Sequence, residues 1–102
     1  MPLLHTVNRG PFERNMLESC IRSANADSSV LLTVDSVIAA MQDTKYSSTV
    51  TDAMANITFY VLGPDLKARG LSESNIVEGV KVVDYDGFVD LTVDHESVQS
   101  WL

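Results

Sequence analysis

The feature that most constrains the fold is a nearly unbroken apolar run at residues 30–34, with the sequence VLLTV. Turn-forming residues precede it at 25–29 (NADSS), and Asp35 and Ser36 follow it. A strand with one wet face alternates apolar and polar side chains, whereas a run without alternation is typical of a strand buried on both faces. Such strands belong to parallel sheets that helices cover on both sides, so this run predicts an α/β fold.

Predicted strands alternate with predicted helices along the chain. The strands occupy residues 3–7, 30–34, 57–62 and 81–85. The helical segments occupy residues 12–24, 37–41, 44–55 and 65–69. Gly70 is placed to end the last of these helices, and the tail from Phe88 is predicted to form one or two short helical turns. This order predicts a single domain over residues 1–102, with a mainly parallel, Rossmann-like or flavodoxin-like sheet and helices on both faces.

The charge of the chain argues against nucleic acid as a direct partner. The net charge is −7, and the seven Lys and Arg residues are scattered, so no basic stripe could neutralise a phosphate backbone. No apolar run approaches the ~20 residues of a membrane span, and the first residues lack the segments of a signal peptide. A single cysteine cannot form an internal disulfide. These observations predict a cytoplasmic protein without a membrane or nucleic-acid partner.

Two features of the chain indicate a protein partner. The mean hydropathy of +0.07 is high for a small domain, which either reflects apolar surface reserved for a partner or the many Ala and Val residues. Trp101 and Leu102 are large apolar residues in a tail that also carries Asp90, Asp94 and Glu96. We expect the two apolar residues to pack against a neighbouring subunit, while the acidic cluster either steers a basic partner or is only a solvated face.

Cys20 is the one residue that could carry sulfur as a persulfide, because that chemistry needs a thiolate. It lies late in the predicted helix 12–24, where the helix dipole opposes a negative charge, and its neighbours at helical spacing are apolar. From the residues alone, a half-buried structural cysteine is the stronger interpretation. His5 is interpreted as a core or rim residue and His95 as a solvated one. Their spacing fits no metal site, so neither a metal nor a cofactor is predicted.

The turn at residues 8–11 (NRGP) joins a strand end to a helix start, where α/β folds bind ligands. Arg9 beside a helix N-terminus could hold an anion, but the chain has no glycine-rich phosphate motif, and a plain connecting turn explains the segment. Asp35 stands where receiver domains have their phospho-acceptor. One acidic residue does not define such a site, and helix capping explains Asp35.

Three segments resemble the DsrH/TusB family and together span essentially the whole chain. They are residues 4–12 (LHTVNRGPF), residues 60–71 (YVLGPDLKARGL) and residues 83–92 (VDYDGFVDLT). DsrH is a subunit of the DsrEFH complex of sulfur-oxidising bacteria, and TusB is its counterpart in the TusBCD complex. Three well-spaced matches are more specific than any single short motif.

The resemblance implies a small α/β subunit in a hetero-hexamer of three related subunits, two copies of each. The complex receives persulfide sulfur and passes it to a small acceptor, DsrC or TusE. The principal sulfur-carrying cysteine of these complexes belongs to another subunit, in a strand-to-helix loop, and this chain has no matching cysteine there. Cys20 matches the cysteine of DsrH proteins, which some TusB proteins lack, and so favours the oxidative branch.

The sequence therefore favours a subunit of a sulfur-relay complex in dissimilatory sulfur oxidation, with DsrE- and DsrF-like partners and Cys20 as an auxiliary persulfide site. The alternative is a non-catalytic structural subunit of a TusBCD-like complex for 2-thiolation of a tRNA wobble uridine. Whether the chain is an enzyme stays open at this point. A third interpretation, an unrelated flavodoxin-like regulatory module, would be monomeric and indifferent to sulfur donors.

Overall fold

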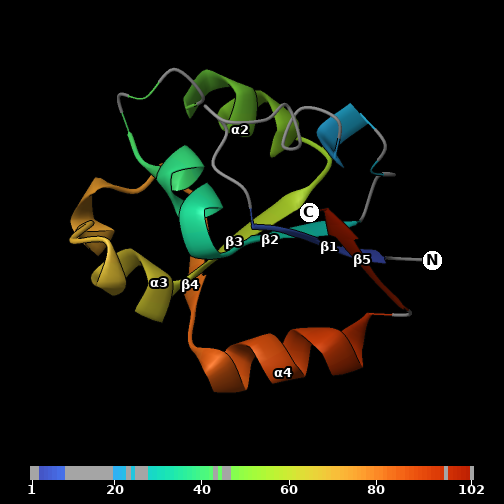
Figure 1. Ribbon diagram of the computed structural model, residues 1–102. Helices are drawn as coiled ribbons and strands as arrows, with labels where there is room; N and C mark the ends of the chain where they lie inside the picture. Colours follow the sequence, from blue (N-terminus) through green and yellow to red (C-terminus); the bar gives the residue numbers. More distant parts are fainter. Residues whose placement is uncertain are drawn as a thin grey trace.

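Five parallel strands form one sheet in the order β4-β3-β2-β1-β5 (Figure 1). The computed structural model describes residues 3–8, 20–22, 24, 28–42, 44, 47–95 and 97–101. The strands are β1 (Leu3–Val7), β2 (Ser29–Leu32), β3 (Thr58–Leu62), β4 (Lys81–Val83) and β5 (Ser97–Trp101). β1 pairs with β2 on one side and with β5 on the other, so that His5 lies opposite both Val30 and Gln99. The predicted α/β class with a parallel sheet is confirmed.

Helices lie on both faces of the sheet. They are η1 (Val34–Ala40), α2 (Ser47–Ala53), α3 (Gly63–Ala68), η2 (Glu73–Asn75) and α4 (Tyr85–Asp94). The first four strands step across the sheet in chain order, so their right-handed connections all lie on one face. The chain then crosses back from β4 to β5, which places α4 on the opposite face (Figure 1). In the part of the chain that the structure describes, no helix is long and apolar enough to span a bilayer.

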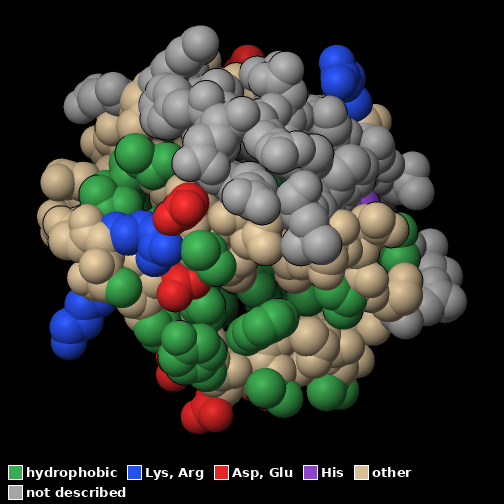
Figure 2. Space-filling model, viewed as in Figure 1, with side chains coloured by type: hydrophobic (Ala, Val, Ile, Leu, Met, Phe, Trp, Pro, Cys, Tyr) green, Lys and Arg blue, Asp and Glu red, His purple; other side chains and the backbone are tan. Residues whose placement is uncertain are grey.

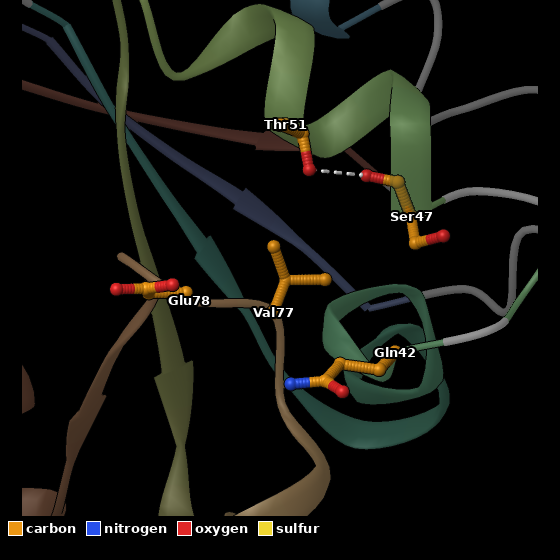
Figure 3. A pocket seen from close by; sticks show the side chains of 5 residues that line it. All are labelled: Gln42, Ser47, Thr51, Val77 and Glu78. Atoms are coloured by element: carbon orange, nitrogen blue, oxygen red, sulfur yellow. Dashed lines mark hydrogen bonds between the residues drawn. The ribbon is translucent and has the colours of Figure 1, made fainter.

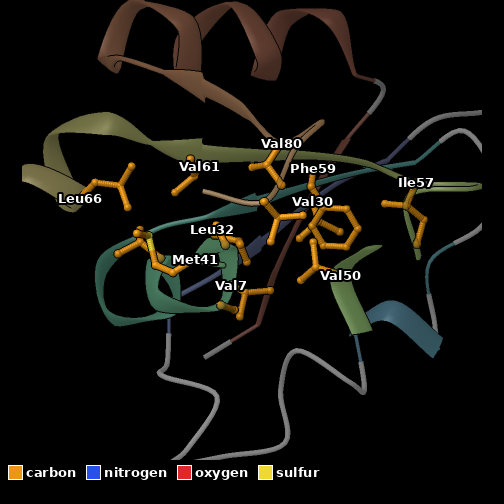
Figure 4. Close-up of a cluster of buried hydrophobic side chains, with 14 of the residues drawn as sticks. Val7, Val30, Leu32, Met41, Val50, Ile57, Phe59, Val61, Leu66 and Val80 are labelled. Atoms are coloured by element: carbon orange, nitrogen blue, oxygen red, sulfur yellow. The ribbon is translucent and has the colours of Figure 1, made fainter. Parts of the chain in front are cut away.

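The sheet separates two hydrophobic cores. The larger one packs strand side chains against η1 and α2, and Figure 4 shows Val30 and Phe59 at its centre. The smaller one lies under α4 and is built on Leu4, Leu31 and Leu91. Successive side chains of β2 point to opposite faces, so Val30 enters the larger core and Leu31 the smaller one. The apolar run at 30–34 therefore did predict a strand buried on both faces, but this strand ends at Leu32, and Val34 begins η1 instead.

Two predictions for residues 84–101 are wrong. The tail from Phe88 is not one or two helical turns, because a ten-residue helix, α4, begins at Tyr85 and β5 follows it. Asp84, predicted to lie within a strand, instead caps α4, and its Oδ1 accepts the Gly87 N–H at 2.8 Å. β5 escaped prediction because a strand at the sheet edge needs no apolar alternation.

The prediction for Gly70 is confirmed, whereas that for helix 12–24 is tested only at its end. Gly70 ends α3 as predicted, with φ at 68° and its N–H donating to the Lys67 carbonyl at 3.1 Å. Most of the predicted helix 12–24 lies outside the described residues. Within it, residues 20–22 are helical, and the Ala24 N–H donates to the Cys20 carbonyl at 2.9 Å.

Leu91→Ala tests whether α4 is fastened to the sheet through its inner face. Leu91 is 7% exposed in the smaller core, whereas Val93, two positions along the same helix, is 77% exposed. We expect Leu91→Ala to lower the free energy of unfolding by about 2–4 kcal/mol, because it leaves a cavity. The control, Val93→Ala, should change it by less than about 0.5 kcal/mol. Urea denaturation followed by circular dichroism measures both, and equal losses would contradict this packing.

Candidate functional site

The carboxyl ends of the parallel strands meet at one edge of the sheet, and a cavity of about 340 Å³ lies there. Open α/β sheets commonly bind their ligands outside this edge. Each strand supplies the cavity with a residue, either its own or from the segment that follows it. The lining consists of Thr6, Asn8, Thr33, Val34, Leu62, Asp65, Tyr85, Phe88 and Ser100. We call this hollow the carboxyl-edge cavity.

A strained turn at the start of η1 forms part of the cavity wall. Val34 has φ at 54°, a left-handed conformation that β-branched residues rarely adopt. Its N–H donates to Oδ2 of Asp65 in α3 at 2.7 Å. The next residue, Asp35, forms an ion pair with Arg69 at 2.9 Å, just beyond α3. Strain of this kind persists only where the surroundings fix it, so these two contacts explain how the turn keeps its shape.

The predicted capping role of Asp35 is wrong, because its carboxylate faces Arg69. Thr33 is the N-cap residue of η1, and its N–H donates to Ser36 Oγ at 2.9 Å. The buried Ser36 hydroxyl also lies within hydrogen-bond distance of the carbonyls of Val7 and Thr33. Ser36 thus ties the ends of β1 and β2 together beside the cavity.

The carboxyl-edge cavity offers binding groups rather than a catalytic pair. Thr6 Oγ1 donates to Ser100 Oγ at 3.2 Å, and Asp65 accepts the N–H of Val34. Nucleophilic catalysis needs a nucleophile within hydrogen-bond reach of a base. Among the described residues that line this cavity there is no cysteine, histidine or lysine. The arrangement can hold a ligand or a partner's side chain, but these lining residues hold no activated nucleophile.

Cys20 is not among the lining residues and lies in the larger core. Its side chain is fully buried, and Ile21 and Ala24 pack against the same cluster. Burial raises the pKa of the Cys20 thiol from its usual 9.0 to about 12. The thiolate is the reactive form, and at that pKa only about one thiol in 10⁵ is ionised at pH 7. Sulfur transfer through Cys20 therefore requires an opening that brings the thiol to solvent.

A second hollow, of about 430 Å³, lies between the end of η1 and α2 (Figure 3). Its lining residues are Gln42, Ser47, Thr51, Val77 and Glu78. The Thr51 hydroxyl donates to the Ser47 carbonyl at 2.8 Å, and the Gln42 amide donates to the Ile76 carbonyl at 2.9 Å. These polar groups are already paired, and Glu78 is the one ionisable group among the described residues of the lining. Those residues form no catalytic arrangement.

The two histidines both have structural positions. His5 is buried in β1, and burial lowers the pKa of its ring. His95, predicted to be solvated, is half-buried at the end of α4. Its Nδ1 donates to the Leu91 carbonyl at 2.6 Å, and its Nε2 lies 2.8 Å from Ser29 Oγ. His95 therefore connects α4 to β2. In the described part of the chain, no group of three or more His, Cys, Asp or Glu side chains could hold a metal ion.

Sequence reasoning found part of this edge of the sheet and missed the rest. The turn at residues 8–11 was singled out, and Asn8 lines the cavity, while residues 9–11 lie outside the described residues. Tyr85 and Phe88 were missed because α4 was not predicted. Asp84, a common N-cap residue, followed by Phe88 and Leu91 at helical spacing was the signal that could have revealed this helix.

Comparison with known proteins gives consistent results along the whole chain. Residues 9–98 match the family model described as "DsrH like protein". The chain is 35% identical over 100 residues to Protein TusB of Pectobacterium parmentieri, covering 97% of this chain and 100% of the relative. It is 33% identical over 99 residues to Protein TusB of Escherichia coli K12, with the same coverage. The crystal structure of the ychN protein from E. coli has the same fold, with a TM-score of 0.84 over 98% of each chain at 17% identity.

The reactivity of Cys20 tests its burial directly. We expect 5,5′-dithiobis(2-nitrobenzoate) to modify the folded protein at least ~100-fold more slowly than the chain unfolded in guanidinium, because a buried thiol reacts only through opening. Release of the coloured thiolate gives both rates. A folded protein that reacts as fast as the unfolded chain would contradict the placement of Cys20 in the core.

The raised pKa of Cys20 also predicts how stability depends on pH. The folded state keeps a proton that the unfolded state loses above about pH 9.0, so this group reduces the free energy of unfolding as pH rises from about 9 towards about 12. The slope is at most about 1.4 kcal/mol per pH unit. Between pH 8 and pH 10, the denaturation midpoint should fall further for the wild type than for Cys20→Ala, since the two proteins share all other titrating groups. An equal fall of the midpoint in both proteins would contradict the raised pKa of Cys20.

Proposed function

This chain belongs to the DsrH/TusB family of sulfur-relay proteins, and we propose that it is the TusB-type subunit of a complex that passes persulfide sulfur towards 2-thiolation of a tRNA wobble uridine. The observation that carries the proposal is similarity along nearly the whole chain to proteins named TusB, at 35% and 33% identity. The family resemblance adds the partners, which would be two related α/β subunits, two copies of each chain, and a TusE-type acceptor.

The tRNA branch is preferred over dissimilatory sulfur oxidation, the branch that Cys20 favoured in the sequence. The relatives named above are TusB proteins rather than proteins of sulfur oxidation. Cys20 does not favour the oxidative branch once its position is known, because packing alone accounts for a fully buried cysteine in an apolar core.

The described residues support a duty in assembly rather than in chemistry. The thiol of Cys20 is buried in the larger core, and the described residues that line the carboxyl-edge cavity include no thiol. Persulfide transfer needs an accessible thiolate. In this proposal the transferring cysteine belongs to a partner subunit, and this chain completes the complex and shapes its docking surfaces. The role of Cys20 as an auxiliary persulfide carrier is a second proposal, which requires residues 20–22 to open.

The proposal is tested in the complex co-expressed with its two related subunits and exposed to a persulfide donor. Intact-mass spectra are compared for wild-type and Cys20→Ala chains. We expect added sulfur on a partner subunit, none on this chain, and unchanged transfer to the acceptor in the Cys20→Ala complex. Added sulfur on the wild-type chain that disappears in Cys20→Ala would instead establish the auxiliary carrier.

A second experiment, in cells, separates the tRNA branch from the sulfur-oxidation branch. Deletion of this chain should abolish 2-thiouridine at the wobble position, measured by mass spectrometry of tRNA nucleosides, and Cys20→Ala should restore it as fully as the wild type. An unchanged 2-thiouridine level in the deletion strain would overturn the tRNA branch and return sulfur oxidation to first place.

A further inference from the structure

Two parallel rows of side chains lie exposed along α4. The apolar row consists of Tyr85, Val89 and Val93, which are 60%, 59% and 77% exposed. The acidic row consists of Asp86, Asp90 and Asp94, all exposed. Both rows repeat every four residues, which places their members above one another on adjacent strips of the helix. We call this surface the α4 double row.

None of the residues of the double row belongs to either hydrophobic core. α4 contacts the sheet through Leu91 and Phe88, which belong to the smaller core, while the double row faces away from it. In the view of Figure 2, hydrophobic side chains gather in the lower part of the molecule, where Figure 1 places α4, and acidic side chains lie among them. Valine is also a weaker helix former than alanine or leucine, so helix stability does not explain two exposed valines. Contiguous exposed apolar side chains of this kind mark interaction sites.

The apolar surface of the α4 double row continues beyond the helix. Tyr85 starts the apolar row and also lines the carboxyl-edge cavity, as Phe88 and Val34 do. Val34, held in its strained turn, is itself 43% exposed. The apolar surface therefore runs from α4 to the edge of the sheet, which gives a partner a longer contact than one helix face provides.

We infer that the α4 double row is the docking surface for a protein partner that presents an apolar ridge beside a row of Lys or Arg side chains. The apolar row would supply the desolvated centre of the contact, and the acidic row would fix its register and speed encounter. The negative charges of α4 and of the whole chain favour this occupant. A second copy of a chain with net charge −7 would bring another row of carboxylates to the same contact, and anionic lipid or nucleic acid would be repelled in the same way.

This inference goes beyond the relay role, and its test reads contact rather than sulfur transfer. A photo-crosslinking amino acid, p-benzoylphenylalanine, replaces Val89 in the full chain expressed in its own host, and replaces exposed Glu78, beside the hollow near α2, as the control. We expect irradiation to give a crosslinked protein from position 89 and not from position 78. The crosslinked peptide, sequenced by mass spectrometry, should carry Lys or Arg next to apolar residues.

Charge reversal separates this contact from a non-specific apolar one. Asp90→Lys with Asp94→Lys should reduce the crosslinking yield at position 89 by at least ~10-fold, because the basic row of the partner then meets like charges. Asp52→Lys with Glu73→Lys makes the same change in net charge at exposed positions away from α4 and should leave the yield unchanged. Circular dichroism checks that both variants fold.

The proposal is overturned by any of three results. These are a crosslink to a second copy of this chain or to lipid, a yield at position 89 no higher than at position 78, or a yield that the two lysines on α4 do not reduce. None of these outcomes bears on the relay function, which the sulfur-transfer and tRNA measurements decide separately.

Discussion

Burial of β2 on both of its faces is the constraint on which the rest of the structure depends. Val30 and Leu32 anchor the larger core, and Leu31 between them anchors the smaller one. Because β2 is wholly buried, helices must cover the sheet on both sides, and the single return crossing from β4 to β5 supplies the second cover, α4. The same parallel arrangement brings the strand ends to one edge, where the carboxyl-edge cavity forms.

The groups that could serve a sulfur relay are kept apart in this chain. The carboxyl-edge cavity is a defined hollow with a strained wall, which the hydrogen bond from Val34 to Asp65 holds in place. Its described lining includes no thiol. The thiol of Cys20 has no access to solvent. A subunit built in this way fits a complex in which one member carries the reactive cysteine and another provides surfaces. That division agrees with the proposed assembly role and with an α4 that covers the core on one side and presents a patterned surface on the other.

The sequence predicted those elements whose signal lies in their own residues. The apolar run at 30–34 and the glycine after α3 needed no knowledge of neighbours. β5 was missed because Ser97, Gln99 and Ser100 carry no strand pattern, and its strand character comes from pairing with β1. Long-range contacts also decided the partners of Asp35 and His95, since Arg69 and Ser29 are distant in sequence. The carboxyl-edge cavity could not be predicted from sequence, because its lining residues come from every strand or from the segment that follows it.

The pairing of β5 with β1 has a consequence for how the protein is made. Thr6 and Ser100 donate and accept a hydrogen bond across 94 residues of chain. On the ribosome, β1 emerges before β5, so the edge of β1 that pairs with β5 stays open until residues 97–101 have been synthesised. An open parallel edge is a template for foreign strands, and contacts of such long range form slowly. A chaperone or an early-arriving subunit that covers this edge of β1 during translation would therefore protect the chain from pairing with foreign strands.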